Sequence, residues 1–460
     1  MGSFDYDLFT IGAGSGGTRA SRLAATKGAR VGLAEESRIG GTCVVRGCIP
    51  KKFLVFGAEF AQAFRDAAGY GWTVGATKFD WATLRDNVAR DVTRLSAIYE
   101  RNLVNAGVEV FAERARIVGP NEVRLASGKT VSAQTILVAA GGRPRRPNEL
   151  TGCELALVSD DAFVLDELPK RMVIVGGGYI AVEFANIFNA LGVDVCLVYR
   201  GHTVLQGFDD DLRIQVHSDL ERHGVRVSSN TMLTSIEEKS GGFSLRTTTG
   251  VQLTADKVLV AIGRDPNTEG IGLGEVGVKL DSTGAIEVDA YSRTNVPSIY
   301  AIGDVTDRLN LTPVAIREAH AFVETVFDKR PCAFDHADVP TAVFCSPPAA
   351  AVGFSEGQAR KTFGAVDIYR TNFRPMRNVL AGNEDRTFMK LVVRGDTHEV
   401  VGVHMVGDVA AEIVQLAAIA VKAKLTKDQW DATCALHPTV AEELVLMREK
   451  YVPPELNTMG

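Results

Sequence analysis

The sequence has no apolar run long enough to span a membrane, since no stretch approaches the ~18 apolar residues that a span requires. The strongest candidate, 409–421, contains Glu412 and Gln415. Cysteine is also scarce: seven residues in 460, an odd number, exclude a disulfide-rich secreted scaffold. A strand pattern begins at Tyr6, so we expect no leader segment before it. These absences favour a cytoplasmic protein in which any disulfide is catalytic.

The chain also lacks an excess of positive charge. Its formal net charge is −6, which argues against nucleic acid or an anionic membrane as the main partner. Apolar residues make up 46% and charged residues 23%, values that exclude a disordered or fibrous chain. At 460 residues the chain is long enough for two to four domains.

A pattern of strand, glycine-rich turn and helix occurs twice. The first instance covers 6–27 and the second covers 172–191. A second apolar strand follows each of them, at 30–34 and at 193–198. Two such βαβ units predict two doubly wound parallel sheets.

The first turn has the spacing Gly-x-Gly-x-x-Gly at Gly12, Gly14 and Gly17. We expect Gly12 to allow a tight turn, Gly14 to let a pyrophosphate approach the backbone, and Gly17 to let the helix pack on the sheet. The helix N-terminus then offers N–H groups and a positive dipole to the phosphates. Glu35 closes the next strand, where its carboxylate can accept hydrogen bonds from ribose hydroxyls. The sequence therefore predicts a dinucleotide site.

The remainder of the chain changes character along its length. The Pro/Gly-rich stretch 141–147 is typical of a linker, and an extended run with a helix occupies 285–337. Apolar and polar residues alternate at 388–393 and 400–406, which indicates an antiparallel sheet. We predict an α/β fold: two Rossmann-like doubly wound dinucleotide-binding domains plus an α+β C-terminal domain.

Two cysteines lie five residues apart, at Cys43 and Cys48, on a glycine-flanked loop. A helix pattern starts at Pro50 with lysines beside it, an environment that lowers the pKa of a nearby thiol. The alternatives are two buried thiols or half of a zinc site. The next cysteine is Cys153, with no histidine nearby, so we expect no metal. A redox-active disulfide is the favoured interpretation.

The segment around these two cysteines resembles a known family, the pyridine nucleotide-disulfide oxidoreductases. Its redox motif is matched by Gly40-Gly41-Thr42-Cys43-x4-Cys48-Ile49-Pro50-Lys51-Lys52. The resemblance continues, in family order, through segments 139–144, 178–183, 261–264, 300–304 and 437–443. It implies an FAD-binding domain at 1–142, an NADPH-binding domain at 143–284, a central domain at 285–337 and a dimerisation domain at 338–460.

The resemblance implies a role for each member of the redox centre. Cys48 would be the thiolate against the flavin, and Cys43 would attack the substrate disulfide. His437 would be the general acid, held by Glu442 across a turn with a cis bond at Pro438. Each active site would combine residues from both chains of a homodimer.

The resemblance also assigns residues to the two cofactors, FAD and NADPH. Lys51 would lie near the flavin N5 and pair with Glu183, while Tyr179 would cover the nicotinamide pocket. The cofactor-binding residues it implies are Gly12, Gly14, Ser15, Gly16, Gly17, Glu35, Thr42, Lys51, Gly141, Asp304, Thr312, Gly176, Gly178, Ile180, Glu183, Arg200, Gln206, Gly263 and Arg264.

The residues that follow strand 193–198 of the second βαβ unit distinguish between NAD and NADP cofactors. An NAD site usually has an acidic residue there, whereas this chain has Arg200, which can pair with a 2′-phosphate. The family generally has a second arginine six residues on, where this chain has Gln206, and His202 can compensate. We therefore predict NADPH.

Within the family, the resemblance implies glutathione disulfide as the substrate. Cationic residues suit its carboxylates, and one position that often holds a substrate-binding arginine holds His320 here. The implied substrate contacts are Arg19, Arg22, Ile98, Tyr99, Asn102 and His320. Alternatives are a lipoamide-type or trypanothione-type disulfide reductase, or a flavin electron carrier without disulfide turnover. Lipoamide enzymes usually have Ser-Lys where this chain has Lys51-Lys52.

Overall fold

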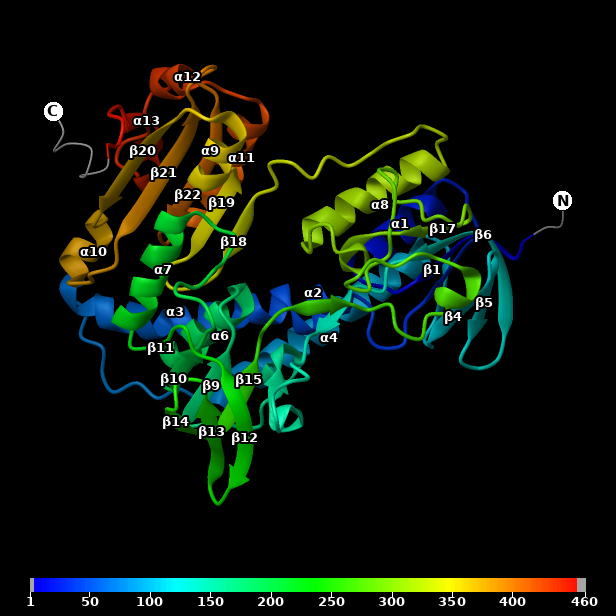
Figure 1. Ribbon diagram of the computed structural model, residues 1–460, viewed down its shortest axis with the longest axis horizontal. Coiled ribbons are helices and arrows are strands. Elements are labelled where there is room, and N and C mark those ends of the chain that lie inside the picture. Colours follow the sequence, from blue (N-terminus) through cyan, green and yellow to red (C-terminus); the bar gives the residue numbers. More distant parts are fainter. Residues whose placement is uncertain (1–3, 453–460) are drawn as a thin grey trace. The chain divides into compact units, whose positions relative to one another are not determined.

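The computed structural model describes residues 4–452 (Figure 1). Contacts within the chain divide these residues into two compact units. The first unit contains the described residues up to Phe53 together with Ala82–Arg145 and Gly263–His336. The second contains Leu54–Trp81, Arg146–Ile262 and the described residues from Ala337 onward. This division is coarser than the four predicted domains, whose bounds remain predictions.

The first unit is built on a mixed sheet of order β3-β2-β1-β6-β5-β4, with β17 pairing β6. The pairs β1–β2, β2–β3, β1–β6 and β6–β17 are parallel, whereas β4–β5 and β5–β6 are antiparallel. Its strands, with the separate pair β7 and β16, are β1 (Tyr6–Ile11), β2 (Val31–Ala34), β3 (Val108–Phe111), β4 (Ala115–Gly119), β5 (Glu122–Leu125), β6 (Thr130–Val138), β7 (Gly142–Pro144), β16 (Arg264–Pro266) and β17 (Ile299–Ala301).

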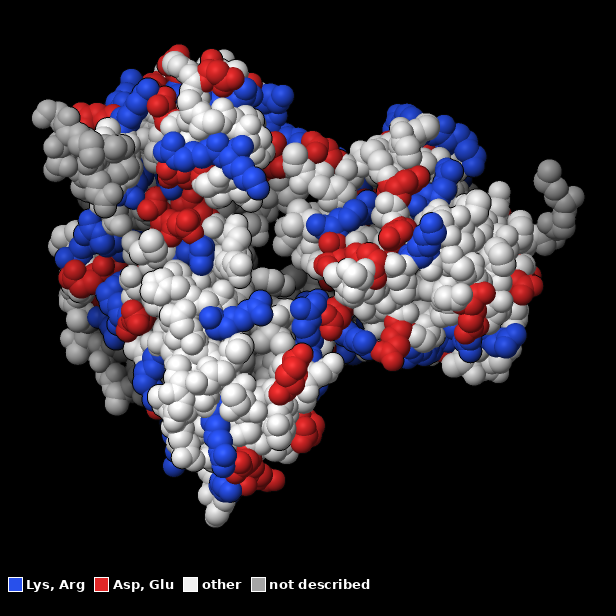
Figure 2. All heavy atoms as spheres, viewed as in Figure 1, with Lys and Arg blue, Asp and Glu red and all other residues white. Residues whose placement is uncertain are grey.

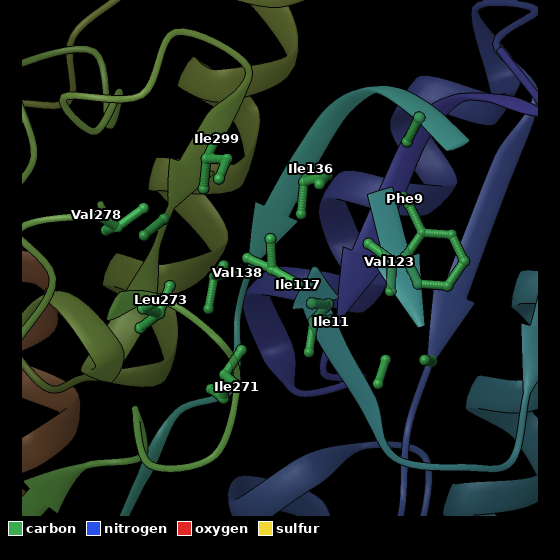
Figure 3. Packing of buried hydrophobic residues seen from close by; sticks show 14 of the residues in the cluster. Phe9, Ile11, Ile117, Val123, Ile136, Val138, Ile271, Leu273, Val278 and Ile299 are labelled. Carbon is green, nitrogen blue, oxygen red and sulfur yellow. The ribbon is translucent and has the colours of Figure 1, made fainter. Parts of the chain in front are cut away.

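Alternate residues of these strands form two cores, one on each face of the sheet. Phe9, Ile136 and Ile299 pack on the face shown in Figure 3, against Ile271 and residues that follow it in the chain. Their neighbours, such as Leu8 and Leu137, pack on the other face against helices α1 and α8. The period of two along each strand therefore buries both faces of the sheet. The helical elements of this unit are α1 (Ser15–Thr26), α2 (Gly41–Arg46), the start of α3 (Cys48–Asp66), α4 (Trp81–Asn105), η3 (Gly274–Val276), η4 (Gly303–Thr306) and α8 (Thr312–Val326).

The second unit contains a parallel sheet of order β11-β10-β9-β15-β8. A small antiparallel sheet, β12-β13-β14, packs its apolar residues into the same core as β9, β10 and β15. The elements of this part are η1 (Ala67–Tyr70), η2 (Cys153–Leu155), β8 (Leu157–Val158), α5 (Ser159–Ala162), β9 (Arg171–Val175), α6 (Tyr179–Ala190), β10 (Asp194–Val198), α7 (Asp210–Arg222), β11 (Arg226–Ser228), β12 (Leu233–Lys239), β13 (Gly242–Thr247), β14 (Gln252–Ala255) and β15 (Lys257–Val260).

The C-terminal part of the second unit is an antiparallel sheet of order β18-β19-β22-β21-β20. Helix α11 packs on one face of it through Val414 and Ala418. The elements are β18 (Thr341–Val343), β19 (Ala349–Gly353), α9 (Glu356–Phe363), β20 (Val366–Phe373), α10 (Met376–Ala381), β21 (Thr387–Arg394), β22 (Val400–Val406), α11 (Ala410–Lys422), α12 (Lys427–Ala432), η5 (Val440–Glu442) and α13 (Glu443–Leu446).

The predicted fold class is confirmed: two sheets built on parallel βαβ units are followed by an antiparallel α+β region. The first sheet is mixed rather than wholly parallel, because β4 and β5 join it in antiparallel pairs. The stretch predicted as a linker is partly a strand, because β7 pairs with β16. No helix within residues 4–452 combines the length and apolar character needed to cross a bilayer. On the face shown in Figure 2, lysine and arginine side chains are interspersed with acidic ones.

Candidate active site

The first glycine turn joins β1 to α1 and has the features that a pyrophosphate requires. Gly12 has φ 102°, and a Cβ there would lie 2.4 Å from the Ala139 carbonyl oxygen. A Cβ on Gly17 would lie 1.9 Å from the Gly12 oxygen, so the helix can approach the turn only with glycine there. Gly14 is different, because nothing lies within 4 Å of its added Cβ. It therefore leaves open space at the start of α1, where Ser15 and Gly16 follow.

Glu35 follows β2 and turns back to the glycine turn. Its carboxylate accepts hydrogen bonds from the Ala13 N–H at 2.8 Å and from the Ser37 N–H at 2.9 Å. An open pocket lies beside it. The lining residues of this pocket are Ile11, Gly12, Ala34, Glu35, Glu36, Glu113, Arg114, Ala115, Ala140, Asn267, Glu269 and Ile271. The sequence predicted Gly12 and Glu35 as site residues but not the others, which come from strands and loops that are distant in the sequence.

Five further predicted cofactor residues of the first unit lie near the end of β6. The Arg264 guanidinium donates to the Gly142 carbonyl and, at 3.4 Å, to the Thr42 hydroxyl. Gly141 has φ 72°, and its carbonyl accepts the Asn267 N–H at 2.9 Å. Burial raises the pKa of Asp304 in η4, and the nearby Arg264 charge acts in the opposite direction. Gly263 precedes Arg264 at the start of β16, in this unit.

A buried carboxylate that the sequence did not reveal supports the turn holding Asp304. Glu318, on α8, is 1% exposed and accepts the Gly303 N–H at 2.7 Å. Its other oxygen accepts Nη2 of Arg308 at 2.8 Å and Nε2 of His336 at 2.7 Å. Glu318 thus holds the backbone immediately before Asp304. A glutamate on the buried face of an amphipathic helix is the signal that could have identified it.

The two cysteines lie on α2 and at the start of α3. Cys43 belongs to the short helix α2 rather than to the expected loop, and Cys48 is the first residue of α3. Both are free thiols, and a hydrogen bond links their side chains. The Cys48 sulfur also lies 3.6 Å from the hydroxyl of Thr312, the first residue of α8. The disulfide form therefore remains a prediction.

The surroundings of the two thiols shift their pKa values in opposite directions. The hydrogen bond from Cys43 lowers the pKa of Cys48 to about 6, with smaller contributions from Thr312 and from the charge of Lys51. Burial opposes this shift. The same hydrogen bond and burial raise the pKa of Cys43. This division favours Cys48 as the thiolate of the reduced pair and Cys43 as the protonated member.

The predicted substrate residues of the first unit lie on three helices. Arg19 and Arg22 belong to α1 and His320 to α8, two helices that pack together. Burial lowers the pKa of His320, and so do the charges of Arg19 and Arg317. The lowered pKa favours the neutral imidazole, so the positive charge near this position comes from Arg19 and Arg317, while Glu324 acts in the opposite direction. The other predicted contacts, on α4, are Ile98, Tyr99 and Asn102.

The second glycine turn joins β9 to α6 in the second unit. Gly176 has φ 138°, and an added Cβ would lie 2.2 Å from the Ala261 oxygen, while that of Gly178 meets nothing within 4 Å. Tyr179, Ile180 and Glu183 are in the first two turns of α6. Tyr179 is 46% exposed, and Glu183 is 3% exposed, accepting the Phe344 N–H at 2.9 Å. Arg200, His202 and Gln206 are exposed on the segment after β10.

His437 and Glu442 form the predicted pair. The imidazole Nδ1 lies 3.0 and 3.2 Å from the two carboxylate oxygens, and the His437–Pro438 peptide bond is cis. The His437 side chain is 80% exposed and that of Glu442 is 14% exposed. The carboxylate therefore orients an imidazole whose other nitrogen faces outward.

The structure groups several of the predicted residues into local clusters. The pairing of Lys51 with Glu183 would join the two units and remains a prediction. Within residues 4–452, no cluster of three or more histidine, cysteine or acidic side chains is arranged for a metal ion.

The comparison with known families agrees with this geometry. Residues 6–319 match the family described as pyridine nucleotide-disulphide oxidoreductase. The chain belongs to this family. Residues 339–448 match the dimerisation domain of the same oxidoreductases. The predicted family is therefore confirmed, and the C-terminal α+β region matches its dimerisation domain.

Named relatives cover almost the whole oxidoreductase chain. It is 50% identical to the glutathione reductase of Burkholderia cepacia over 450 residues, 98% of this chain and 100% of the relative. The chain is 46% identical to the glutathione reductase of Nostoc sp. over 460 residues, which cover 97% of this chain and 100% of the relative. For the chloroplastic/mitochondrial enzyme of Pisum sativum the identity is 45% over 457 residues, 97% of this chain and 82% of the relative.

Proposed function

We propose that this oxidoreductase is an NADPH-dependent, FAD-containing reductase of glutathione disulfide. The observation that carries the proposal is the Cys43–Cys48 pair on α2 and at the start of α3, one thiol with a lowered pKa and one protonated. A pair divided in this way is suited to dithiol–disulfide exchange. Relatives named glutathione reductase at 45–50% identity over nearly full length support the choice of substrate.

The residues present fit FAD. The open space at Gly14, the N-terminus of α1, and the pocket beside Glu35 would hold its diphosphate and adenosine portion. Asp304 and Thr312 would face the ribityl and flavin portion close to Cys48. Bound FAD would supply two-electron transfer between the nicotinamide and the cysteine pair.

The two cysteines would divide disulfide reduction into two exchanges. Cys43 attacks glutathione disulfide, forming a mixed disulfide and releasing one glutathione as a thiolate. The Cys48 thiolate then attacks the Cys43 sulfur, closing the Cys43–Cys48 disulfide and releasing the second glutathione. The substrate gains two electrons and the pair loses two. Because Cys43 is protonated, its attack needs a base, and His437 would take that proton and return it to a leaving thiolate.

The exposure of His437 supports a shared active site in a homodimer. Its imidazole is oriented by Glu442 but is 80% exposed in its own chain, so the ring is available to a partner subunit. Refolding Cys48→Ser and His437→Ala chains together tests this arrangement. A mixed dimer then has one site with both defects and one intact site, and should recover about half the unaltered activity. Recovery of no activity would place the site within one chain.

NADPH would bind at the second glycine turn. Gly176 and Gly178 would accommodate the diphosphate, with Ile180 on the first turn of α6, and Arg200 would meet the 2′-phosphate. Tyr179 would cover the nicotinamide pocket, and Glu183 would pair with Lys51. These roles extend the predictions made from the sequence.

The substrate would lie against α1 and α8, with the positive charge supplied by the arginines of α1. Arg19, Arg22 and His320 would meet the carboxylates of glutathione disulfide, and Ile98, Tyr99 and Asn102 would contact it from α4. We also propose that the protein works in the cytoplasm, because seven cysteines in 460 residues are too few, and odd in number, for a disulfide-rich secreted scaffold.

A single assay tests the proposed function. NADPH oxidation is measured with glutathione disulfide, lipoamide and trypanothione disulfide in parallel. We expect turnover with glutathione disulfide at least about tenfold above the other two, because cationic side chains select a substrate with free carboxylates. Turnover with lipoamide or trypanothione disulfide alone would refute the substrate, and turnover with none would refute the enzyme.

A further inference from the structure

The segment between β10 and α7, residues 199–208 (the phosphate loop), carries the residues proposed to meet the 2′-phosphate. Arg200, His202 and Gln206 are exposed on it, whereas Val204 and Leu205 between them are 0% and 1% exposed. The loop therefore presents polar side chains outward from a buried backbone anchor.

The loop backbone is joined to the glycine turn. Leu205 has φ 57°, uncommon for a branched residue, and its N–H donates to the Gly177 carbonyl at 2.6 Å. The Gly201 carbonyl accepts the Asn230 N–H at 2.9 Å. The site for the diphosphate and the site for the 2′-phosphate are thus held in one fixed geometry.

One side chain fixes the middle of the loop from behind. Arg213, on α7, donates through Nε to the Val204 carbonyl at 3.0 Å and through Nη2 to the Thr203 carbonyl at 2.9 Å. Its Nη1 donates to Asp210 at 2.6 Å, and the side chain is 21% exposed. A planar guanidinium that bonds two successive carbonyls fixes both orientations, which a lysine cannot do.

The start of α7 is itself held in place. Asp209, 1% exposed, caps the helix and accepts Nζ of Lys390 at 2.9 Å and the Glu356 N–H at 2.9 Å. Arg213 therefore projects from an anchored helix onto the loop.

We propose that Arg213 is a positioning residue for recognition of the 2′-phosphate, acting through the phosphate loop. The inference rests on the proposed use of NADPH. With Gln206 in place of a second arginine, Arg200 is the main cation for the phosphate, so affinity depends on how well the loop is preorganised. The nitrogen atoms of Arg213 bond the loop and Asp210, so it orients Arg200 rather than binding the phosphate.

The experiment titrates the FAD-loaded protein with 2′,5′-ADP, which carries the 2′-phosphate, and with 5′-AMP, which lacks it. Isothermal titration calorimetry gives both affinities without turnover. We expect Arg213→Met to weaken 2′,5′-ADP binding about tenfold and 5′-AMP binding less than about twofold. The control is Arg226→Met, which removes the same charge from an exposed pair with Asp194 at the other end of β10.

Arg213→Lys separates position from charge, because it keeps the positive charge but loses the planar set of guanidinium donors. We expect this variant to bind 2′,5′-ADP at least about threefold more weakly than the unaltered protein does. It also tests the inference if the methionine variant fails to fold. Full recovery by lysine, or equal loss of both ligands, would overturn the inference. Equal affinity of the unaltered protein for the two ligands would instead refute the NADPH assignment, so the two failures are distinguishable.

Discussion

The two glycine turns share one backbone design. The first glycine of each has positive φ and packs against the end of a neighbouring strand, at Ala139 for Gly12 and at Ala261 for Gly176. Each helix then begins after a glycine, Gly14 or Gly178, beside open space. Because a glycine N-cap has no capping side chain, the first N–H groups of both helices remain available to phosphates.

The two turns differ where the second strand of each βαβ unit ends. After β2, Glu35 turns back and accepts the Ala13 N–H, so its carboxylate is fixed beside the turn. After β10, the chain leaves as the phosphate loop with Arg200 exposed. The glycine turn has the shape that a diphosphate requires in both units, so we expect the residue at the strand end to select the rest of the nucleotide.

The third position of the turn gives the largest expected effect. A Cβ at Gly17 would lie 1.9 Å from the Gly12 oxygen, so Gly17→Ala must displace α1 from the sheet. We expect a loss of about 3 kcal/mol in the free energy of unfolding and loss of bound flavin. Denaturant unfolding and flavin absorbance after gel filtration measure the two effects.

The matched change in the second turn is Ala181→Gly, at a position that already has a Cβ. It should cost only about 0.5–1 kcal/mol, the usual cost of glycine in a helix, and leave flavin content unchanged. Equal loss of flavin in the two variants would mean that the turns are not separate sites.

The strand ends provide the next prediction. Arg200→Ala should lower kcat/KM for NADPH about 10- to 100-fold, because a charge-assisted contact contributes roughly 1.5–3 kcal/mol. The value for NADH should barely change, and Gln206→Arg should widen the preference. Steady-state kinetics with both nucleotides measure this. An unchanged ratio of the two kcat/KM values in Arg200→Ala would contradict the role of this strand end.

Glu35 is the counterpart in the first unit. Glu35→Gln keeps an acceptor for the Ala13 N–H but removes the carboxylate charge, so we expect weaker FAD binding with NADPH preference unaltered. A changed preference for NADPH over NADH in Glu35→Gln would mean that the two glycine turns do not bind separate cofactors.

A buried residue behind the first site gives a moderate effect. Glu318→Gln removes a charge that faces Arg308 and His336, while an amide oxygen can still accept the Gly303 N–H. We expect FAD to bind about tenfold more weakly, because η4 and Asp304 lose part of their support. Flavin fluorescence during dilution measures the affinity. Glu324→Gln, on the same helix but in an exposed pair with Arg330, should leave it unchanged.

Motifs with short spacing could be predicted from the sequence because their geometry is local. The turn at Gly12–Gly17, the cysteine spacing and the approach of His437 to Glu442 each depend on a few consecutive residues. The strand and helix patterns were likewise sufficient for the fold class, since each sheet buries alternate or continuous apolar residues.

The unpredicted features depend on contacts between distant segments. Glu318 meets Gly303, Arg308 and His336, and Arg213 meets the phosphate loop, only after the chain folds. A glutamate within an amphipathic helix carries no mark of what it binds. Cys43 was expected on a loop, but residues 41–46 form the short helix α2 between two glycines.

The first site also contains the Cys43–Cys48 thiol pair, which has no counterpart at the second glycine turn. Because the folded state lowers the pKa of Cys48 to about 6, its thiolate should form as pH rises through that value and be lost below it. The pH dependence of iodoacetamide alkylation at Cys48, in the reduced FAD-loaded protein, measures this. The unperturbed pKa of a cysteine is about 8.5, so a midpoint there would mean that the pair has no effect.

Two variants sharpen this last prediction by separating the causes of the shift. The hydrogen bond from Cys43 is the largest cause, so Cys43→Ala should raise the pKa of Cys48 the most. Thr312→Val, which removes the hydroxyl 3.6 Å from the sulfur, should raise it less. Each pKa unit corresponds to about 1.4 kcal/mol, so the two midpoints rank the two hydrogen bonds directly. A larger shift in Thr312→Val would assign the thiolate to the start of α8 rather than to the cysteine pair.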